Sequence, residues 1–187
     1  TANSHNFKWL LGDVKAAEGG YYHITAVKKD GSVWAAGYNA HGQLGDGTTT
    51  SRKNFVKVVD DGMVYVSTGY YHSTAIKQDG SLWATGYNNY GQLGDGTAIN
   101  RRYFMQVING GVMDVSSGQH NTMVLKQDGS VWATGNVWCY GQDADVLTGC
   151  LSRFVQVLSS GVQAIAVSYH TIILHQNGSV WSIGANE

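Results

Sequence analysis

Hydrophobic and polar positions along this chain form short runs that alternate or are rich in β-branched residues, and glycine-containing turns separate them. One set of four runs is VYVSTG at 64–69, HSTAIK at 72–77, SLWATG at 81–86 and FMQVI at 104–108. Runs of this length and alternation are typical of buried or half-buried β-strands. The pattern therefore predicts an all-β fold built from a unit of four strands.

The same unit recurs along the chain. The segments DGSVWAAG, DGSLWATG, DGSVWATG and NGSVWSIG carry a tryptophan every 49 residues, at Trp34, Trp83, Trp132 and Trp181. Four-stranded units in tandem, with a period of about 40 to 50 residues, are typical of β-propeller blades. We therefore predict a single propeller domain over residues 1–187, with four four-stranded blades per chain. The approximate repeats are 7–54, 55–103, 104–153 and 154–187.

The ends of the chain predict how the propeller closes. The run FKWLL at 7–11 resembles a fourth strand, and the last unit stops after its third strand at WSIGANE. Pairing the N-terminal strand with the last blade would remove two open edges, which favour aggregation. Either one chain forms a four-bladed ring or two chains exchange this strand in an eight-bladed homodimer, and the sequence leaves both open. Small residues of the first strands fit a crowded centre in either case: Ser67, Ser116, Ser117 and Ala166.

Two kinds of turn repeat with the blades. Asp-Gly or Asn-Gly separates the second and third strands, and these pairs favour a type I′ hairpin with positive φ at both central positions. The stretch GQLGDGT stands at 42–48 and again at 91–97, and it lacks both the lysine of a phosphate-binding loop and the acidic ladder of an EF-hand. We interpret it as the connector from the third to the fourth strand. Its glycines would make tight turns and its polar side chains would satisfy local amides: Gly42, Gly45, Gly47, Asp46 and Thr48.

Composition and charge exclude some classes of partner. The chain has 25 Gly and no Pro, with 11 Tyr and 6 Trp, which fits many short strands. With 12 basic and 13 acidic side chains there is no basic excess to attract nucleic acid. No apolar run approaches the roughly 20 residues of a membrane span, and from the start at Thr1 we expect no charged leader with an apolar segment. We expect neither nucleic acid nor membrane insertion.

The segment GYYHSTAIKQDGSLWATGYNNYGQLGDGT resembles the regulator of chromosome condensation repeat family, and the resemblance covers residues 7–187. It implies a β-propeller, usually of seven blades, whose members serve mainly as protein-interaction platforms. They include an exchange factor for a nuclear GTPase, a plant UV-B photoreceptor and secreted inhibitors of β-lactamases, so the family shares a fold and not a function. The photoreceptor would need Trp and Arg where this chain has tyrosine pairs such as Tyr21 and Tyr22.

The chain also departs from the family pattern. It has four repeats, the usual proline before the fourth strand is replaced, and the third connector reads NVWCYGQDADVLTGCLSR. That connector holds Cys139 and Cys150, whose spacing suits a disulfide that would contribute roughly 2 to 3 kcal/mol by the chain-entropy estimate. We predict the disulfide over two free thiols, and with it a secreted or otherwise extracytoplasmic protein. The sequon at 177–179 is interpreted as a turn.

No residue pattern predicts catalysis, a metal or a cofactor. The four repeated tryptophans are expected to pack between sheets. His23, His72 and His170 occupy equivalent positions, with Asn121 in the third repeat, and a radial repeat would separate them around the ring instead of bringing them together as ligands. We expect structural histidines. No Ser-His-Asp set or close carboxylate pair is visible, so an enzyme is not expected.

The remaining signal is a surface. The loops after the first and third strands should emerge on one face, opposite the Asp-Gly hairpins, and tyrosine, tryptophan and asparagine are typical of binding surfaces. The predicted binding face consists of Tyr21, Tyr22, Tyr38, Asn39, His41, Tyr70, Tyr71, Tyr87, Asn88, Asn89, Tyr90, Trp138, Tyr140 and Tyr169. Our hypothesis is a non-enzymatic binding module for a macromolecule, with protein as the favoured partner. A multivalent, glycan-binding lectin is the first alternative, and a guanine-nucleotide exchange factor is the second.

Overall fold

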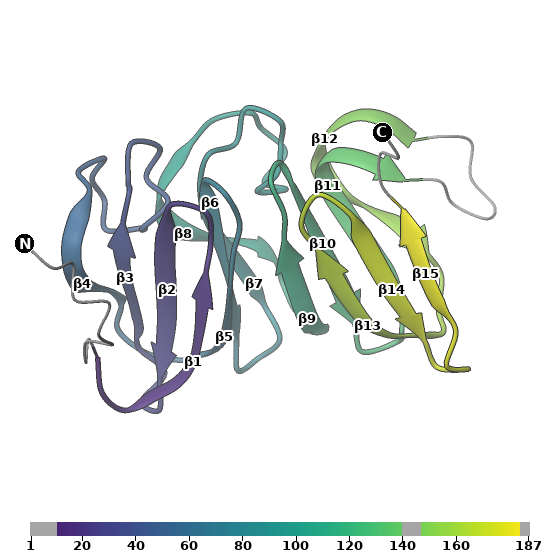
Figure 1. Ribbon diagram of the computed structural model, residues 1–187, viewed down its shortest axis with the longest axis horizontal. Helices are drawn as coiled ribbons and strands as arrows, with labels where there is room; N and C mark the ends of the chain where they lie inside the picture. Colours follow the sequence, from purple (N-terminus) through teal and green to yellow (C-terminus); the bar gives the residue numbers. More distant parts are fainter. Residues whose placement is uncertain (1–10, 140–146, 184–187) are drawn as a thin grey trace, which may run out of the picture.

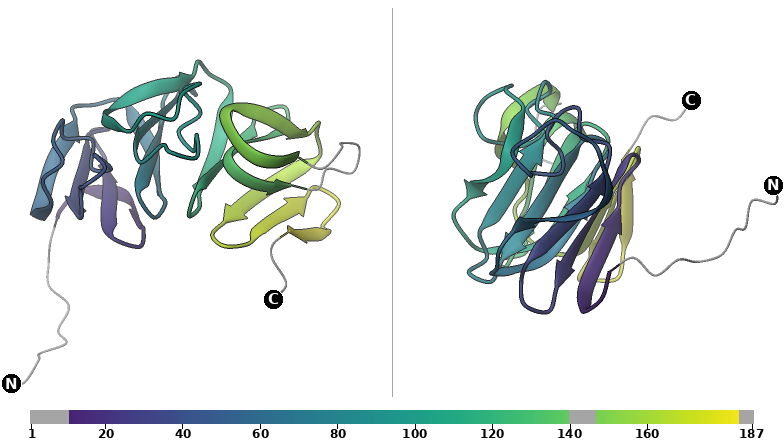
Figure 2. Two further views of the ribbon diagram at one scale, coloured as in Figure 1. Left: turned by 90° about the horizontal axis from the view of Figure 1, so that it is seen from above. Right: turned by 90° about the vertical axis from the view of Figure 1, so that its left-hand side faces the viewer.

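A computed structural model describes residues 11–139 and 147–183 of the chain, which fold into four antiparallel sheets arranged in an arc (Figures 1 and 2). Blade 1 consists of β1 (Val14–Gly19), β2 (His23–Lys28), β3 (Val33–Gly37) and β4 (Arg52–Val59). Blade 2 consists of β5 (Met63–Thr68), β6 (His72–Lys77), β7 (Leu82–Gly86) and β8 (Arg101–Ile108). Blade 3 consists of β9 (Val112–Ser117), β10 (Asn121–Lys126), β11 (Val131–Cys139) and β12 (Leu147–Leu158). Blade 4 consists of β13 (Val162–Val167), β14 (Thr171–His175) and β15 (Val180–Ile183).

The four-strand unit expected from the sequence is confirmed. Within each sheet the strands lie in chain order, so that each strand pairs with the next along the chain. The fourth strands begin three residues earlier than the apolar run indicated, at Arg52 in blade 1 and Arg101 in blade 2. In blade 3 the rewritten connector continues the ladder, because β11 and β12 pair as far as Cys139 and Leu147.

The Asp-Gly hairpins differ from the predicted type I′ geometry. In blade 1 only Gly31 has positive φ, at 81°, and the amide of Gly31 donates to the carbonyl of Lys28. The hairpin is therefore a three-residue loop, in which a type I turn is followed by a glycine with positive φ. Asp30 has a different role from the predicted one, since its carboxylate accepts hydrogen bonds from the amide and hydroxyl of Ser32. The aspartate supports the turn through its side chain instead of adopting positive φ.

The hydrophobic core lies between neighbouring blades. At the first junction Val27 and Val33 of blade 1 pack against Met63, Val66 and Ala75 of blade 2, and all five are buried. Equivalent clusters fill the other two junctions. Because β-strand side chains alternate between two faces, each inner blade contributes one apolar face to each junction.

The repeated tryptophans and the small residues of the first strands were also expected to pack between blades. Trp83 and Trp132 pack against the junction clusters as expected, but Trp181 in blade 4 is 41% exposed, so the prediction of core packing is wrong for that residue. The first strands meet at the inner side of the arc, where the hydroxyl of Ser67 accepts from the amide of Ser117 and that of Ser116 accepts from the amide of Val167. Small serines thus permit close approach of these strands.

Closure of the ring is not seen within the described residues. Blades 1 and 4 lie at opposite ends of the arc (Figure 2), and no fourth strand pairs with β15 in the part of the chain that the structure describes. The predicted N-terminal strand at 7–11 falls almost wholly outside that part. Among the same residues, no helix is long and apolar enough to cross a membrane.

The predicted disulfide is not formed. Cys150 is an exposed free thiol. The β11–β12 register places Cys150 opposite Asn136, whereas Cys139 lies opposite Leu147. Three residue steps along a ladder separate the two cysteine backbones by roughly 10 Å, beyond the reach of a disulfide. The extracytoplasmic location was inferred from that bond, and without it the location stays a prediction.

Candidate binding face

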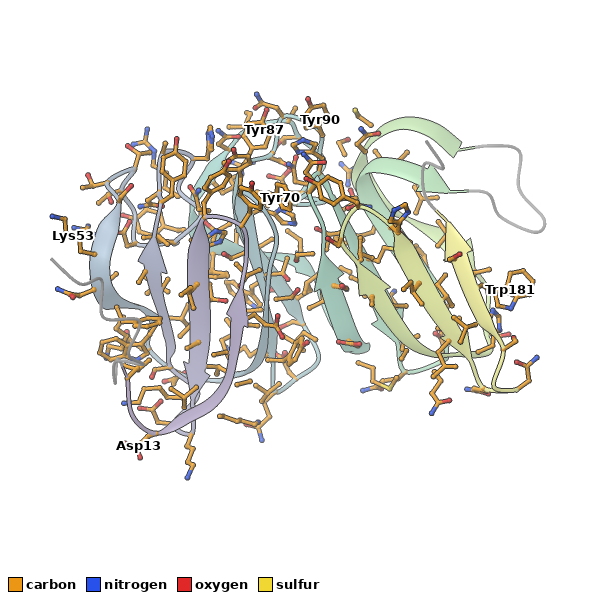
Figure 3. The ribbon with its side chains drawn as sticks, in the orientation of Figure 1. Asp13, Lys53, Tyr70, Tyr87, Tyr90 and Trp181 are labelled. Atoms are coloured by element: carbon orange, nitrogen blue, oxygen red, sulfur yellow. The ribbon has the colours of Figure 1, made fainter. Side chains whose placement is uncertain are left out.

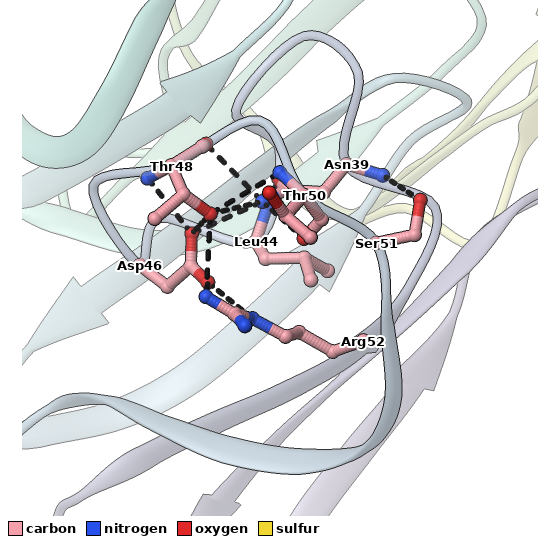
Figure 4. Close-up of polar contacts among 7 residues, drawn as sticks. All are labelled: Asn39, Leu44, Asp46, Thr48, Thr50, Ser51 and Arg52. Atoms are coloured by element: carbon pink, nitrogen blue, oxygen red, sulfur yellow. Dashed lines mark hydrogen bonds and ion pairs between the residues drawn. The ribbon is translucent and has the colours of Figure 1, made fainter.

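In blades 1 and 2 a buried asparagine holds the connector between the third and fourth strands. In blade 1 the Asn39 side-chain amide donates to Asp46 Oδ1 at 3.0 Å and to the carbonyl of Thr50 at 3.1 Å, while its oxygen accepts from the amide of Leu44 at 3.0 Å (Figure 4). The Thr48 amide donates to the same carboxylate. With a further hydrogen bond to the carbonyl of Thr48 at 3.2 Å, the Asn39 side chain pairs with three backbone groups of the loop, which therefore needs no regular secondary structure.

An ion pair completes the connector. Arg52 donates to Asp46 Oδ2 through Nε at 2.7 Å, and its Nη2 atom lies 2.6 Å from the same oxygen as an ion pair. Burial alone would raise the pKa of Asp46, but hydrogen bonds from Thr48, Arg52 and Asn39 outweigh it, and the pKa lies below its usual value. Blade 2 repeats the arrangement with Asn88, Asp95 and Arg101.

These contacts correct the predicted binding face at two positions. Asn39 and Asn88 are fully buried, and their amides are committed to the connectors. They lie inside the loops because an amide can donate and accept at once, which a loop with unpaired backbone groups requires. The interpretation of GQLGDGT as a connector is confirmed, with φ between 78° and 82° at Gly42, Gly45 and Gly47.

The connectors of blades 1 and 2 are also anchored on the blade that follows them. The carbonyl of Gly42 accepts from the Thr85 hydroxyl at 3.0 Å, and the carbonyl of Gln43 accepts from the Ser73 hydroxyl at 2.8 Å. Gly45 lies against the ring of Phe104, where a Cβ atom would come within 2.7 Å of the ring. The loops therefore sit on two sheets, and their tips are fixed in space.

Buried histidines join the same contacts. His23 Nε2 lies 2.7 Å from Ser73 Oγ, and His72 Nε2 lies 2.9 Å from Thr122 Oγ1. Because the Ser73 proton is donated to Gln43, the histidine must donate, which fixes the neutral Nε2–H tautomer. Burial lowers the pKa of His23 to about 4 and that of His72 to about 3. Structural histidines are confirmed at these two positions, whereas His170 is exposed.

No metal site accompanies these histidines. Within the described ranges there is no group of three or more His, Cys, Asp or Glu side chains that could hold a metal ion. The ring nitrogens that carry no proton, Nδ1 of His23 and of His72, have no hydrogen-bond partner. Each ring instead uses its Nε2 atom to contact a hydroxyl group of the following blade.

The loops bring aromatic rings together across three blades. Tyr21 stacks on Tyr70, with ring centroids 4.7 Å apart, and Tyr70 meets Tyr169 edge-on at 5.6 Å. In a second row Tyr22 stacks on Tyr71 at 5.0 Å. Offset stacking and edge-on contacts of this kind stabilise aromatic pairs beyond their buried area.

The second row continues along the connectors. The ring centroid of His41 lies 5.2 Å from that of Tyr71 and 4.8 Å from that of Tyr87. The ring centroids of Tyr90 and His120 are 4.5 Å apart. Figure 3 shows Tyr70, Tyr87 and Tyr90 on one side of the molecule, and Asp13 on the opposite side. We define the aromatic face as Tyr21, Tyr22, Tyr38, His41, Tyr70, Tyr71, Tyr87, Tyr90, His120 and Tyr169.

The aromatic face is uncharged at neutral pH. Burial and a hydrogen bond with Tyr169 raise the pKa of Tyr70 to about 12, and a hydrogen bond with Tyr71 raises the pKa of Tyr22. Burial lowers the pKa of His41 and of His120. Tyr22 and Tyr70 thus keep their protons, and the imidazoles of His41 and His120 stay neutral.

Other members of the predicted face fall in different places. Asn89 is exposed on the second connector. The side chain of Trp138 and all of Tyr140 lie outside the described residues. His120 was missed, although it stands 49 residues after Tyr71, which is itself 49 residues after Tyr22. A comparison of the equivalent positions in the first three repeats would have identified His120 as a member of the face.

The comparisons with known proteins agree with a propeller of four-stranded blades. Sequence profiles of the Regulator of chromosome condensation (RCC1) repeat match residues 14–43 and 59–92, and a second profile of this repeat matches 79–125. Together they cover more than half of the chain, which therefore belongs to the RCC1 repeat family. No curated protein matches the chain in sequence.

Several solved structures share the fold. Human WBSCR16 is 21% identical with a TM-score of 0.78, and the match covers 91% of this chain and 47% of WBSCR16. Yeast RCC1 (Prp20), solved with Kap60, is 20% identical with a TM-score of 0.77 over 91% of this chain and 43% of that one. Prp20p of Saccharomyces cerevisiae, described with its binding to Gsp1p and histones, is 20% identical with a TM-score of 0.74 over 96% and 47%. The chain spans less than half the length of each.

Proposed function

We propose that this chain is a non-enzymatic binding module whose aromatic face binds another protein. The observation that carries the proposal is the continuous layer of rings, in which His41, Tyr87 and Tyr90 stand on connectors that are fixed to two sheets. Its outermost members, Tyr21 and Tyr169, are 62% and 67% exposed. Tyrosine gives a large contact area at low entropy cost, and pre-ordered loops lower the cost of binding further.

Two considerations favour a protein over a sugar. A sugar-binding site needs hydrogen-bonding groups beside the stacking ring to fix orientation, and the amides of Asn39 and Asn88 are committed inside the connectors. The fold neighbour Prp20 is described with protein partners: Kap60, Gsp1p and histones. The exchange-factor alternative is supported by family membership alone, and release of labelled nucleotide from Gsp1p would test it.

The test compares the wild-type chain with a Tyr21→Ser/Tyr169→Ser variant and a Tyr103→Ser control. Tyr103 is 68% exposed but lies on β8, outside the aromatic face. Each protein is used as bait in a quantitative pull-down and on a glycan array, after folding is checked by circular dichroism. A protein retained by wild type and control but lost with the double variant is the expected result. Glycan binding lost only with the double variant would favour a lectin, and equal capture by all three would refute the aromatic face.

A further inference from the structure

The first strands of the four blades enclose a pocket on the inner side of the arc. The pocket has a volume of about 360 Å³, and its lining comes from β1, β5, β9 and β13 and from the loops that follow these strands. Tyr21 and Tyr70 belong both to this lining and to the aromatic face. The pocket therefore opens beside the rings that the proposed function assigns to a partner protein.

Glycines at the strand ends bring these rings to the mouth of the pocket. A Cβ atom on Gly20 would collide with the carbonyl oxygen of Gly69, and one on Gly69 would collide with that of Gly118. Neighbouring strand ends thus lie too close together for a side chain. Because Tyr21 and Tyr70 directly follow two of these glycines, the close approach places their rings in a stack. The mouth is therefore formed before any ligand binds, which lowers the cost of binding.

The pocket holds a negative charge without a cation. Among the described residues, Glu18 is the only charged side chain in the lining. Asp114 stands two residues before Ser116 of the lining, on the same face of β9. Burial and the charge of Asp114 raise the pKa of Glu18, and burial raises the pKa of Asp114. No ion pair within residues 11–139 and 147–183 involves either carboxylate, so a bound cation would offset an unfavourable charge.

Hydroxyl oxygens supply further acceptors in the lining. Ser67 Oγ accepts from the amide of Ser117 at 3.0 Å, and Ser116 Oγ accepts from the amide of Val167 at 2.8 Å. A hydroxyl oxygen has two acceptor positions, so each of these serines can accept one more hydrogen bond. None of the described residues in the lining is Lys, Arg, His, Asn or Gln. The pocket therefore suits a ligand that mainly donates hydrogen bonds.

The two carboxylates depart from the repeat. The position of Glu18 carries no charge in the other blades, which have Ser67, Ser116 and Ala166 there. Asp114 is likewise the only acidic residue at its position in the four blades. A side chain that blade packing requires should recur from blade to blade. Two unmatched carboxylates on the inner side of the arc are better explained by a ligand.

We propose, on the basis of the proposed function, that this pocket binds an arginine side chain of the partner protein, with Glu18 as its counter-ion. A guanidinium is planar and always charged, so it stacks on a tyrosine ring while its five N–H groups donate to carboxylate and hydroxyl oxygens. A lysine has fewer donors and no plane to stack. A neutral sugar would leave the charge of Glu18 uncompensated.

The first test is a titration of the isotope-labelled chain followed by NMR. The probe is N-acetyl-arginine N-methylamide, and its uncharged citrulline analogue is the control ligand. Glu18→Gln removes the charge and keeps the length of the side chain, whereas Asp61→Asn removes an equal charge at an exposed position outside the pocket. Saturable shifts of the Gly19, Thr68 and Ser117 amides are expected with the arginine probe alone. Glu18→Gln should weaken its binding by about tenfold or more, and Asp61→Asn by less than about twofold.

Four outcomes of the titration would overturn the proposal. Equal shifts with the arginine and citrulline ligands would show that the pocket does not select a charge. Binding that Glu18→Gln leaves unchanged would place the cation elsewhere. The absence of shifts around the pocket at every probe concentration that keeps the wild-type chain folded would exclude the site. Equally tight binding of N-acetyl-lysine N-methylamide would refute the choice of arginine.

The second test separates a failure of the pocket from a failure of the proposed function. The wild type, Glu18→Gln, Asp61→Asn and Tyr21→Ser/Tyr169→Ser serve as baits in the same quantitative pull-down. A partner retained by wild type and Asp61→Asn but depleted by about tenfold with Glu18→Gln is expected. A partner lost only with the tyrosine variant would refute the pocket and leave the aromatic face standing. Equal capture by all four baits would refute a partner protein as the source of the cation, even if the arginine probe binds in the titration.

Discussion

Lowering the pH should destabilise this protein through two buried neutral histidines. Burial lowers the pKa of His23 to about 4 and that of His72 to about 3, from an ordinary value of 6.5. Between pH 6.5 and these folded pKa values, both imidazoles bind a proton in the unfolded chain but stay neutral in the folded chain. The stability contributed by the neutral histidines is therefore complete above about pH 6.5 and falls as the pH falls toward the folded pKa values.

The size of the effect follows from the same values. At pH 5 each histidine is about 1.5 pH units below its unfolded pKa and still neutral in the fold, which costs about 2 kcal/mol per residue. The pair should lower the free energy of unfolding by about 4 kcal/mol between pH 7.5 and pH 5. Glu18 and Asp114 act in the opposite direction, because their folded pKa values are raised and their protonation favours the fold.

Urea denaturation at both pH values measures this free energy in the wild type and in a His23→Asn/His72→Asn variant. Asparagine is the matched substitution, because Asn121 occupies the equivalent position in blade 3. The acidic residues are present in both proteins, so their effect cancels in the difference. The variant should be less stable at neutral pH but should lose about 4 kcal/mol less on acidification. An equal loss in both proteins would refute the assignment of the effect to these histidines.

Three further outcomes are expected, and the first two are measured by urea denaturation. Asp46→Ala should cost about 2 to 4 kcal/mol because it leaves an amide and a guanidinium without their acceptor, whereas Asp60→Ala at an exposed ion pair should cost less than about 1 kcal/mol. Gly178→Ala should cost about 1 to 2 kcal/mol for its positive φ alone, and Gly45→Ala should cost clearly more because its Cβ also meets the ring of Phe104; equal costs would contradict the contact. Cys150 of the folded chain should react with a thiol reagent without prior reduction, and no reaction would restore the disulfide.

The sequence predicted the blades because a 49-residue period leaves few alternatives. The strand order, the buried histidines of blades 1 and 2 and the connector function of GQLGDGT all followed from that period. The turn type was wrong because Asp-Gly pairs occur in more than one hairpin geometry, and a local dipeptide does not decide between them. The disulfide was wrong because the number of residues between two cysteines does not fix the strand register.

The candidate site was predicted in part. The tyrosine rings lie together because they follow the strand ends in the repeats, and their role in binding stays a prediction. Asn39 and Asn88 were predicted to be exposed because they stand in loops and their hydrogen-bond partners lie several residues away in the sequence. A signal was available: the spacing from Asn39 through Asp46 to Arg52 is repeated without change from Asn88 to Arg101. Three polar residues repeated with unchanged spacing indicate a hydrogen-bond network within the loop and not an exposed binding surface.

Because the connectors of blades 1 and 2 are anchored on the sheet that follows them, the stability of these loops depends on the direction along the chain. If blade 3 were lost from the C-terminal side, the connector of blade 2 would lose the support of Thr122 and Thr134, and the rings of Tyr87 and Tyr90 would lose their fixed positions. If blade 1 were lost from the N-terminal side, the connector of blade 2 would keep its anchors on blade 3. Local opening measured by hydrogen exchange should therefore spread from blade 2 to the connector of blade 1 and from blade 3 to the connector of blade 2, and not forward.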